Sequence, residues 1–303
     1  MDAAFIGQQL VNGLAYGAII ALIALGYTMV YGVLKLINFA HSDIFMIGAF
    51  IAYYAGRMIS TGNPWTGAAV ILLLAMAGCS LLGIGIERFA YRPLRSSPRL
   101  NSLITAIGIS FLLEYGGQIV FGTNVKTFPP LLPSGPTDKF TLGGVTVTYI
   151  QLIVMATAGA LMIALEWIVF KSRLGRAMRA TSFSFDHAAL LGIPVDQVIA
   201  LTFVIGSSLA AAGGILYAAA YVKITPIMGV MPGLKAFVAA VLGGIGNVTG
   251  AMLGGLIIGL TETLFAAFPA TSQYREGVAF VILIIILLFK PEGLMGRPVK
   301  EKV

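Results

Sequence analysis

The chain has 303 residues, of which 58% are hydrophobic and only 10% are charged, and its formal net charge is +7. Soluble domains of average composition carry roughly a quarter charged residues, so this composition excludes an ordinary soluble protein and requires a surface that faces lipid. The basic residues lie in short runs between apolar segments, which indicates membrane orientation rather than nucleic-acid binding. We therefore expect an all-α membrane protein whose residues 1–303 form a single transmembrane domain, a polytopic helical bundle.

Apolar segments near the length of about 20 residues that crosses a bilayer recur along the chain. The first apolar run reads as a membrane span, since it is too long for a leader peptide and has no basic flank before it. Two segments are too short to cross alone, so we expect eight or nine passes with short or interrupted helices. In chain order the predicted segments are 10–34, 44–56 (short), 66–86, 100–121, 149–170, 195–221, 234–245 (short), 252–268 and 277–289.

The basic residues fix the predicted orientation. They concentrate in 87–99, in 171–179 and in the tail 290–303, which all fall on one side if the odd-numbered passes run inward. Loops rich in Lys and Arg stay in the cytoplasm, so the C-terminus is predicted inside and, with nine passes, the N-terminus outside. The Pro-rich segment 122–148 becomes an outer loop, in which Gly143-Gly144 between alternating Thr and Val predicts a β-hairpin.

A polar break separates the first two apolar segments. It contains Asn38, His41, Ser42 and Asp43. Polar groups at membrane depth are costly and usually line a protein interior or a cavity. Two interpretations stay open: Ser42 and Asp43 cap the second helix, or the four side chains line a translocation path beside an interrupted helix.

The inward segment 171–197 is the longest polar stretch on that side. It begins as a basic amphipathic helix and continues into a second short helix with small and apolar side chains, which Gly192 and Pro194 terminate. The segment is either a docking element held in a groove of another protein or an ordinary solvated loop. Its candidate docking residues are Phe185, Asp186, His187, Ala188, Ala189, Gly192 and Pro194.

Glycine is dense over residues 229–259. Gly243, Gly244 and Gly246 allow either close helix packing or a discontinuous helix near a translocation path. The sequence G-x-x-x-x-G-K-[ST] is absent, so we expect no nucleotide site of the P-loop kind and no enzyme activity of the chain itself.

Other site chemistry is sparse. The single cysteine excludes an internal disulfide, and no His, Asp or Glu cluster has the spacing of a metal site, so neither a cofactor nor a metal is expected. Three intramembrane acids, Glu114, Glu166 and Glu262, are functional candidates by default because charge at membrane depth is costly. Glu262 is expected in the outer half of the membrane.

Several separated stretches resemble LivH-type permeases of branched-chain amino-acid ABC importers. The resemblance covers nearly the whole chain, and the stretches occur in the order of the family. One departure is Ser42, where many relatives carry Gly in an A-H-G-D string, which bears on the backbone geometry there. The stretches are 11–50, 91–110, 185–218, 235–255 and the ending GRPVKEKV.

The resemblance implies a multi-pass subunit of the bacterial inner membrane that moves a small amino acid by alternating access. It implies as partners a second homologous permease, two ATP-binding subunits that hold ATP and Mg²⁺, and a periplasmic or extracellular substrate-binding protein. Residues 185–194 correspond to the coupling loop of the family, the place an ATPase grips. Leucine, isoleucine and valine are the expected cargo, with urea or short amides as the alternative within the family.

Two other classes of protein remain as rivals. An ion-coupled secondary transporter would carry membrane acids placed for Na⁺ or H⁺ and would need no inward docking helix. A membrane-embedded enzyme would need a nucleophile or a metal set, and the sequence offers no recognisable one.

Overall fold

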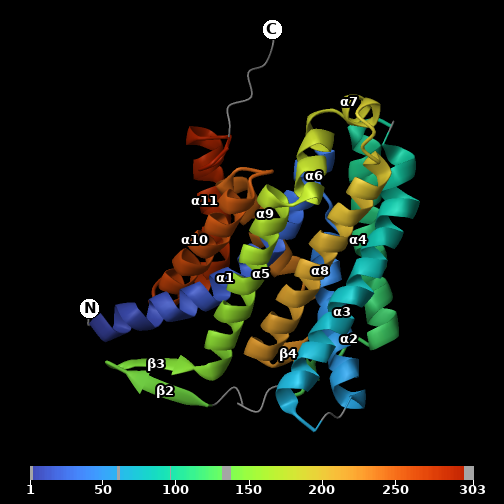
Figure 1. Ribbon diagram of the computed structural model, residues 1–303. Helices are drawn as coiled ribbons and strands as arrows, with labels where there is room; N and C mark the ends of the chain where they lie inside the picture. Colours follow the sequence, from blue (N-terminus) through green and yellow to red (C-terminus); the bar gives the residue numbers. More distant parts are fainter. Residues whose placement is uncertain (1–2, 60–61, 96, 132–137, 297–303) are drawn as a thin grey trace.

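The computed structural model describes residues 3–59, 62–95, 97–131 and 138–296, with the side chain of Arg99 excepted. It is a helical bundle with two small antiparallel strand pairs at one end (Figure 1). The helices are α1 (Ala3–Leu34), α2 (His41–Met58), α3 (Pro64–Ile86), α4 (Arg99–Phe121), α5 (Tyr149–Lys171), α6 (Arg173–Phe183), α7 (Phe185–Leu190), α8 (Val195–Tyr221), α9 (Val230–Gly243), α10 (Val248–Ala266) and α11 (Arg275–Phe289).

Short elements connect these helices. Helix α3 continues through a π-helical turn (Glu87–Tyr91) and a 3-10 turn (Arg92–Leu94), and a further 3-10 turn (Ser272–Tyr274) precedes α11. The strands are β1 (Lys126–Thr127), β2 (Lys139–Leu142), β3 (Val145–Thr148) and β4 (Lys223–Ile224), and they pair β1 with β4 and β2 with β3.

The predicted helical bundle is confirmed. In the described part of the chain, seven helices are long and apolar enough to cross a membrane, and α9 is a shorter apolar helix of 14 residues. The second predicted segment becomes the 18-residue α2, which begins three residues before the predicted boundary. Helix α1 begins at Ala3 rather than Leu10, because its first turns rest on the hairpin: Gln8 donates to the carbonyl of Thr146 at 2.9 Å and accepts from the Thr146 amide.

The hairpin predicted around Gly143-Gly144 is present as β2 and β3. Phe140 pairs with Val147, and both turn glycines have positive φ, which glycine adopts without steric cost. Thr148 then begins α5 through a capping box in which Thr148 and Gln151 exchange side-chain and backbone hydrogen bonds. Two prolines of the predicted outer loop, Pro133 and Pro136, lie outside the described residues.

Helices α1 and α8 are the two most buried membrane-length helices, and α8 packs directly on α1, α2 and α3. Small residues of α8 make these contacts, so its backbone lies close to those of its neighbours. A Cβ on Gly214 would collide with the carbonyl oxygen of Phe45 in α2, and one on Gly48 of α2 would lie 2.5 Å from the Cα of Ala211. On α3, Gly83 packs against Ser207 in the same way. Helix α8 is therefore in close contact with three neighbouring helices.

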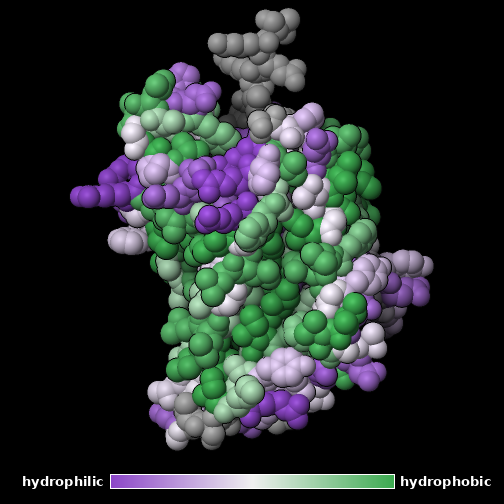
Figure 2. Space-filling view, turned by 90° about the vertical axis from the view of Figure 1, so that its right-hand side faces the viewer, coloured by the Kyte–Doolittle hydropathy of each residue, from purple (hydrophilic) through white to green (hydrophobic). Residues whose placement is uncertain are grey.

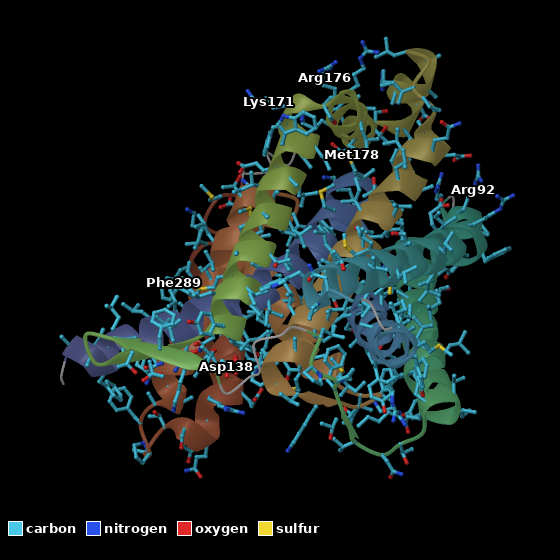
Figure 3. All side chains as sticks on the ribbon, turned by 60° about the horizontal axis from the view of Figure 1, so that its bottom comes forward. Arg92, Asp138, Lys171, Arg176, Met178 and Phe289 are labelled. Carbon is cyan, nitrogen blue, oxygen red and sulfur yellow. The ribbon has the colours of Figure 1, made fainter. Side chains whose placement is uncertain are left out.

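The polar residues mark the two ends of the bundle. Arg92, Lys171 and Arg176 lie at the end that carries α7, and Asp138 lies toward the other end (Figure 3). Between the ends, a broad hydrophobic belt covers the face shown in Figure 2. The predicted grouping of basic segments on one side thus agrees with the structure, although the tail residues Arg297, Lys300 and Lys302 lie outside the described residues.

Candidate functional site

The polar break between α1 and α2 is buried inside the bundle. Helix α2 begins at His41, and its N-cap residue, Ala40, makes no side-chain capping hydrogen bond. The capping interpretation of Ser42 and Asp43 is therefore wrong. The Ser42 hydroxyl instead donates to the carbonyl of Phe39 at 2.9 Å, and Asp43 lies in the first turn, where a carboxylate is favoured by the helix dipole.

Each polar side chain of the break meets a different neighbour. Tyr91 donates to Asn38 Oδ1 at 3.1 Å, and Ser110 of α4 donates to the carboxylate of Asp43 at 2.5 Å. The imidazole of His41 packs edge-on against the ring of Tyr27, with ring centroids 4.8 Å apart. All these break residues are at least nine-tenths buried, so this conformation encloses them.

The start of α9 meets the start of α2 at this point. A Cβ on Gly229 would collide with the carbonyl oxygen of Ser42, and one on Gly233 would collide with the Ser42 Cβ. Glycine is required at both places because the two backbones touch. Two interrupted helices thus place their N-terminal ends together inside the bundle, an arrangement that transporters use around a substrate path.

The glycines 243–246 lie elsewhere. Helix α9 ends at Gly243, and Gly244 and Gly246 have φ values of 102° and 95°, so the chain turns there in a conformation that favours glycine. Gly243 touches Gly250 of α10, and its carbonyl accepts from the Met295 amide at 3.1 Å. The structure therefore places Gly243, Gly244 and Gly246 at the other end of α9 from Ser42, beside the segment that follows α11.

Removing the Ser110 hydroxyl should weaken the break. A buried carboxylate that loses a hydrogen-bond donor costs about 1–3 kcal/mol. The Ser110→Ala variant is thus expected to unfold at lower temperature in detergent than the wild type. Its control is Ser208→Ala, because Ser208 donates only to the carbonyl of Ile205 in its own helix. Equal stability of the two variants would contradict a structural role for the Ser110–Asp43 contact.

The predicted docking segment forms α6 and α7, and α7 lies at the tip of the basic end (Figure 1). Ser184 caps α7 by accepting from the His187 amide at 3.3 Å. Gly192, with φ of +78°, terminates the helix, and Ile193 donates to the carbonyl of Ala188 at 3.0 Å. Hydrogen bonds therefore fix both ends of α7, and the helix ends before Gly192 and Pro194 as predicted.

The candidate docking residues do not all face outward. Phe185, Asp186, His187, Ala189, Gly192 and Pro194 are exposed, whereas Ala188 is buried beneath the helix and anchors it. Three large apolar side chains flank them: Phe183 is 89% exposed, Leu190 84% and Leu191 78%. The sequence indicated Leu190 and Leu191 as apolar contacts of the short helix, whereas Phe183 was missed, although an apolar side chain on a polar segment was the available signal.

An ion-pair network joins the α7 end to α3. Asp196, in the first turn of α8, accepts from Arg95 at 2.5 Å and pairs with Arg92. Arg95 also pairs with Glu87, which is buried in the π-helical turn after α3. Burial lowers the pKa of the Arg95 guanidinium from its ordinary value, and the charge of Glu87 opposes that shift. The start of α8 and the end of α3 are thereby linked directly beneath α7.

The geometry defines a class of protein: a multi-pass helical membrane protein with an exposed short helix at its basic end and a buried meeting of two helix N-termini. The described residues contain no group of three or more His, Cys, Asp or Glu that could hold a metal ion.

The chain belongs to the family described as "Branched-chain amino acid transport system / permease component", whose model matches residues 9–287. It is 44% identical to the high-affinity branched-chain amino acid transport system permease protein BraD of Pseudomonas aeruginosa, over 98% of this chain and 97% of BraD. It is 43% identical to LivH of Escherichia coli K12, with the same coverage. The probable permease protein LivH of Methanocaldococcus jannaschii is 25% identical over 96% of this chain and 93% of that protein. The chain is thus a permease component of an ABC transport system and is not itself an ATPase.

Proposed function

We propose that the chain imports leucine, isoleucine and valine across the bacterial inner membrane by alternating access, as one of two homologous permeases in an ATP-driven assembly. Two ATP-binding subunits supply the energy and hold ATP and Mg²⁺, and a periplasmic or extracellular binding protein delivers the amino acid. The observation that carries the proposal is α7, a capped helix with apolar side chains exposed at the basic end. Exposed apolar side chains gathered in this way mark a surface that contacts another protein or the membrane.

Coupling proceeds through α8 in this proposal. ATP binding moves the partner subunits, which grip α7 between Phe185 and Pro194. The push passes to α8 through Ala188 and through the pairs that Asp196 makes with Arg92 and Arg95. Because α8 packs on α1, α2 and α3 through small residues, the helices around the break move with it.

The translocation path in this proposal runs beside the meeting of α2 and α9. Asn38, His41, Ser42 and Asp43 are buried here, and separation of the two helix ends would expose them. Gly243, Gly244 and Gly246 act at the basic end as a turn on which α9 swings, since Gly244 and Gly246 have the positive φ values that glycine adopts freely. The loop 122–148, with its hairpin, faces the binding protein.

Uptake into vesicles tests the proposal. Vesicles that carry the whole assembly, with the binding protein outside, are supplied with labelled leucine or labelled urea. We expect leucine uptake that requires ATP inside and no urea uptake above background. Uptake driven by an ion gradient without ATP, or transport of urea in preference to leucine, would contradict it.

Changes at the ends of α7 should uncouple ATP hydrolysis from uptake. A Gly192→Val variant forces a β-branched residue into a left-handed conformation that costs about 1–2 kcal/mol even for ordinary residues. The turn that terminates α7 is therefore destabilised. Asp186→Lys reverses a charge in the first turn of the same exposed helix. Both variants should hydrolyse ATP while leucine uptake falls several-fold. Normal uptake in both variants would contradict the assignment of the coupling segment.

A further inference from the structure

A buried cluster of opposite charges joins three helices at the end of the bundle away from α7. Lys235 of α9 lies between two carboxylates, with its Nζ 2.6 Å from Glu262 Oε1 of α10 and 2.6 Å from Glu276 Oε2 of α11. The same Nζ donates to the hydroxyl of Tyr16 in α1 at 3.3 Å. The side chains of Lys235 and Glu262 are only 3% and 8% exposed.

The buried part of this cluster is a single ion pair between Lys235 and Glu262. Glu276 is 43% exposed, and a second cation, Arg275, lies beside it at the rim with Nε 3.5 Å from Glu276 Oε1. Buried charge is costly unless it is paired and hydrogen-bonded. Glu276, which has a second cation beside it, is therefore the partner of Lys235 that the carboxylate of a ligand can replace.

Two carboxylate oxygens of the cluster accept no hydrogen bond within the described part of the chain, and one of them, Glu276 Oε2, is still ion-paired with Lys235 Nζ at 2.6 Å. Glu262 Oε2 is buried and accepts no hydrogen bond from any of the described residues. Buried carboxylate oxygens are nearly always hydrogen-bonded, so an unpaired one indicates a missing donor.

A cavity of about 240 Å³ adjoins the cluster. Its wall combines the charged groups with an aromatic side, in which the rings of Tyr217 and Tyr221 lie 4.5 Å apart and those of Tyr16 and Tyr221 lie 6.3 Å apart. Met231 and Pro232, at the start of α9, add apolar surface. A ligand in this cavity contacts both cationic and carboxylate groups at one end and an apolar wall at the other.

We propose that this cavity binds an α-amino acid as a zwitterion on its way through the permease. The ammonium group of the substrate donates to Glu262 Oε2, its carboxylate takes the place of Glu276 as a partner of Lys235, and its apolar side chain rests on the tyrosines. The released Glu276 keeps Arg275 as its partner. This inference rests on the proposed function, because it takes the imported amino acid as the ligand.

The location suits such a site. Glu276 is the second residue of α11, whose other end leads toward the basic side of the bundle, so this lining residue of the cavity belongs to the end of α11 away from α7. It also lies on α9, the helix whose first residues meet Ser42. Occupation of the cavity therefore acts on α9, the helix that meets α2 at the break.

Direct binding tests the inference. The permease pair with its ATP-binding subunits, in lipid nanodiscs without the binding protein, is titrated with radiolabelled leucine. We expect saturable binding that unlabelled leucine displaces. Neither 4-methylpentanoate, which lacks the ammonium group, nor 3-methylbutylamine, which lacks the carboxylate, should compete. The Glu262→Gln variant should bind leucine at least tenfold more weakly, whereas Glu166→Gln, a change of the same kind in α5 and outside the cavity, should bind as the wild type does.

A purely structural ion pair gives a different pattern. In the Lys235→Glu, Glu262→Lys, Glu276→Lys triple variant both ion pairs of residue 235 are restored with their charges exchanged, so a structural role predicts recovery of binding and uptake. A zwitterion site predicts no recovery, although the thermal stability of the assembly returns toward that of the wild type. Recovery of binding in the triple variant, unchanged affinity in Glu262→Gln, or equal competition by 4-methylpentanoate would overturn the inference.

Uptake of leucine by the wild-type assembly separates the two proposals. If the assembly imports leucine but Glu262→Gln binds and transports it as well as the wild type does, the cavity assignment is wrong and the proposed function still stands. If the wild-type assembly imports no branched-chain amino acid, the proposed function fails first.

Discussion

Replacing both Leu190 and Leu191 by aspartate should abolish uptake and release the ATP-binding subunits. These side chains are 84% and 78% exposed, so their replacement leaves the bundle intact. Central apolar side chains of an interface each cost about 2 kcal/mol or more when lost, and a loss of 1.4 kcal/mol weakens binding tenfold. We expect the double variant, purified through a tag on the permease, to retain less than about a tenth of the wild-type amount of ATP-binding subunits.

The control for this variant lies at the opposite end of the molecule. Leu142 in β2 is 74% exposed, so Leu142→Asp introduces the same chemical change at the hairpin. It should retain the ATP-binding subunits fully. If the double variant at 190 and 191 also retains them, α7 is not the docking helix.

Replacing Gly214 by valine should destabilise the whole bundle. Any Cβ there collides with the carbonyl oxygen of Phe45, and backbone cannot move aside as a flexible side chain can. Overpacking of this kind costs about 1–3 kcal/mol or more. Because α8 is also the proposed transmitter, we expect a lower unfolding temperature in detergent and a larger loss of uptake than of assembled protein.

The matched variant is Gly108→Val in α4. Nothing lies within 4 Å of a Cβ at that position, so the same side chain finds open space. Its unfolding temperature should stay close to that of the wild type. A similar loss of stability in both variants would indicate a general intolerance of valine in membrane helices rather than a close contact between α8 and α2.

The elements of the fold were largely predictable because they depend on local composition. Hydropathy located the spans, and Gly143-Gly144 located the hairpin. Gly192 predicted the end of α7. The early start of α1 was missed, since it depends on the contact of Gln8 with a hairpin more than a hundred residues away.

The site was harder to predict because its contacts join distant segments. The polar residues 38–43 suggested a buried break, but their partner Ser110 and the touching glycines 229 and 233 lie far along the chain. The capping interpretation failed for a local reason, as Ser42 lies too far into the helix and bonds back to Phe39. Glu262 was noticed as an intramembrane acid, yet only the fold shows Lys235 beside it.

The central claim is that nucleotide bound by partner subunits changes the buried meeting of α2 and α9. It is tested most directly by the Ser42→Cys variant in a Cys79→Ala background, because Cys79 is the one cysteine of the chain and Ser42 is only 9% exposed. The rate of labelling by a membrane-permeant maleimide is measured without nucleotide, with ATP, and after trapping with vanadate. We predict slow labelling in one of these states and at least tenfold faster labelling in another. The same rate in all three states would contradict the account.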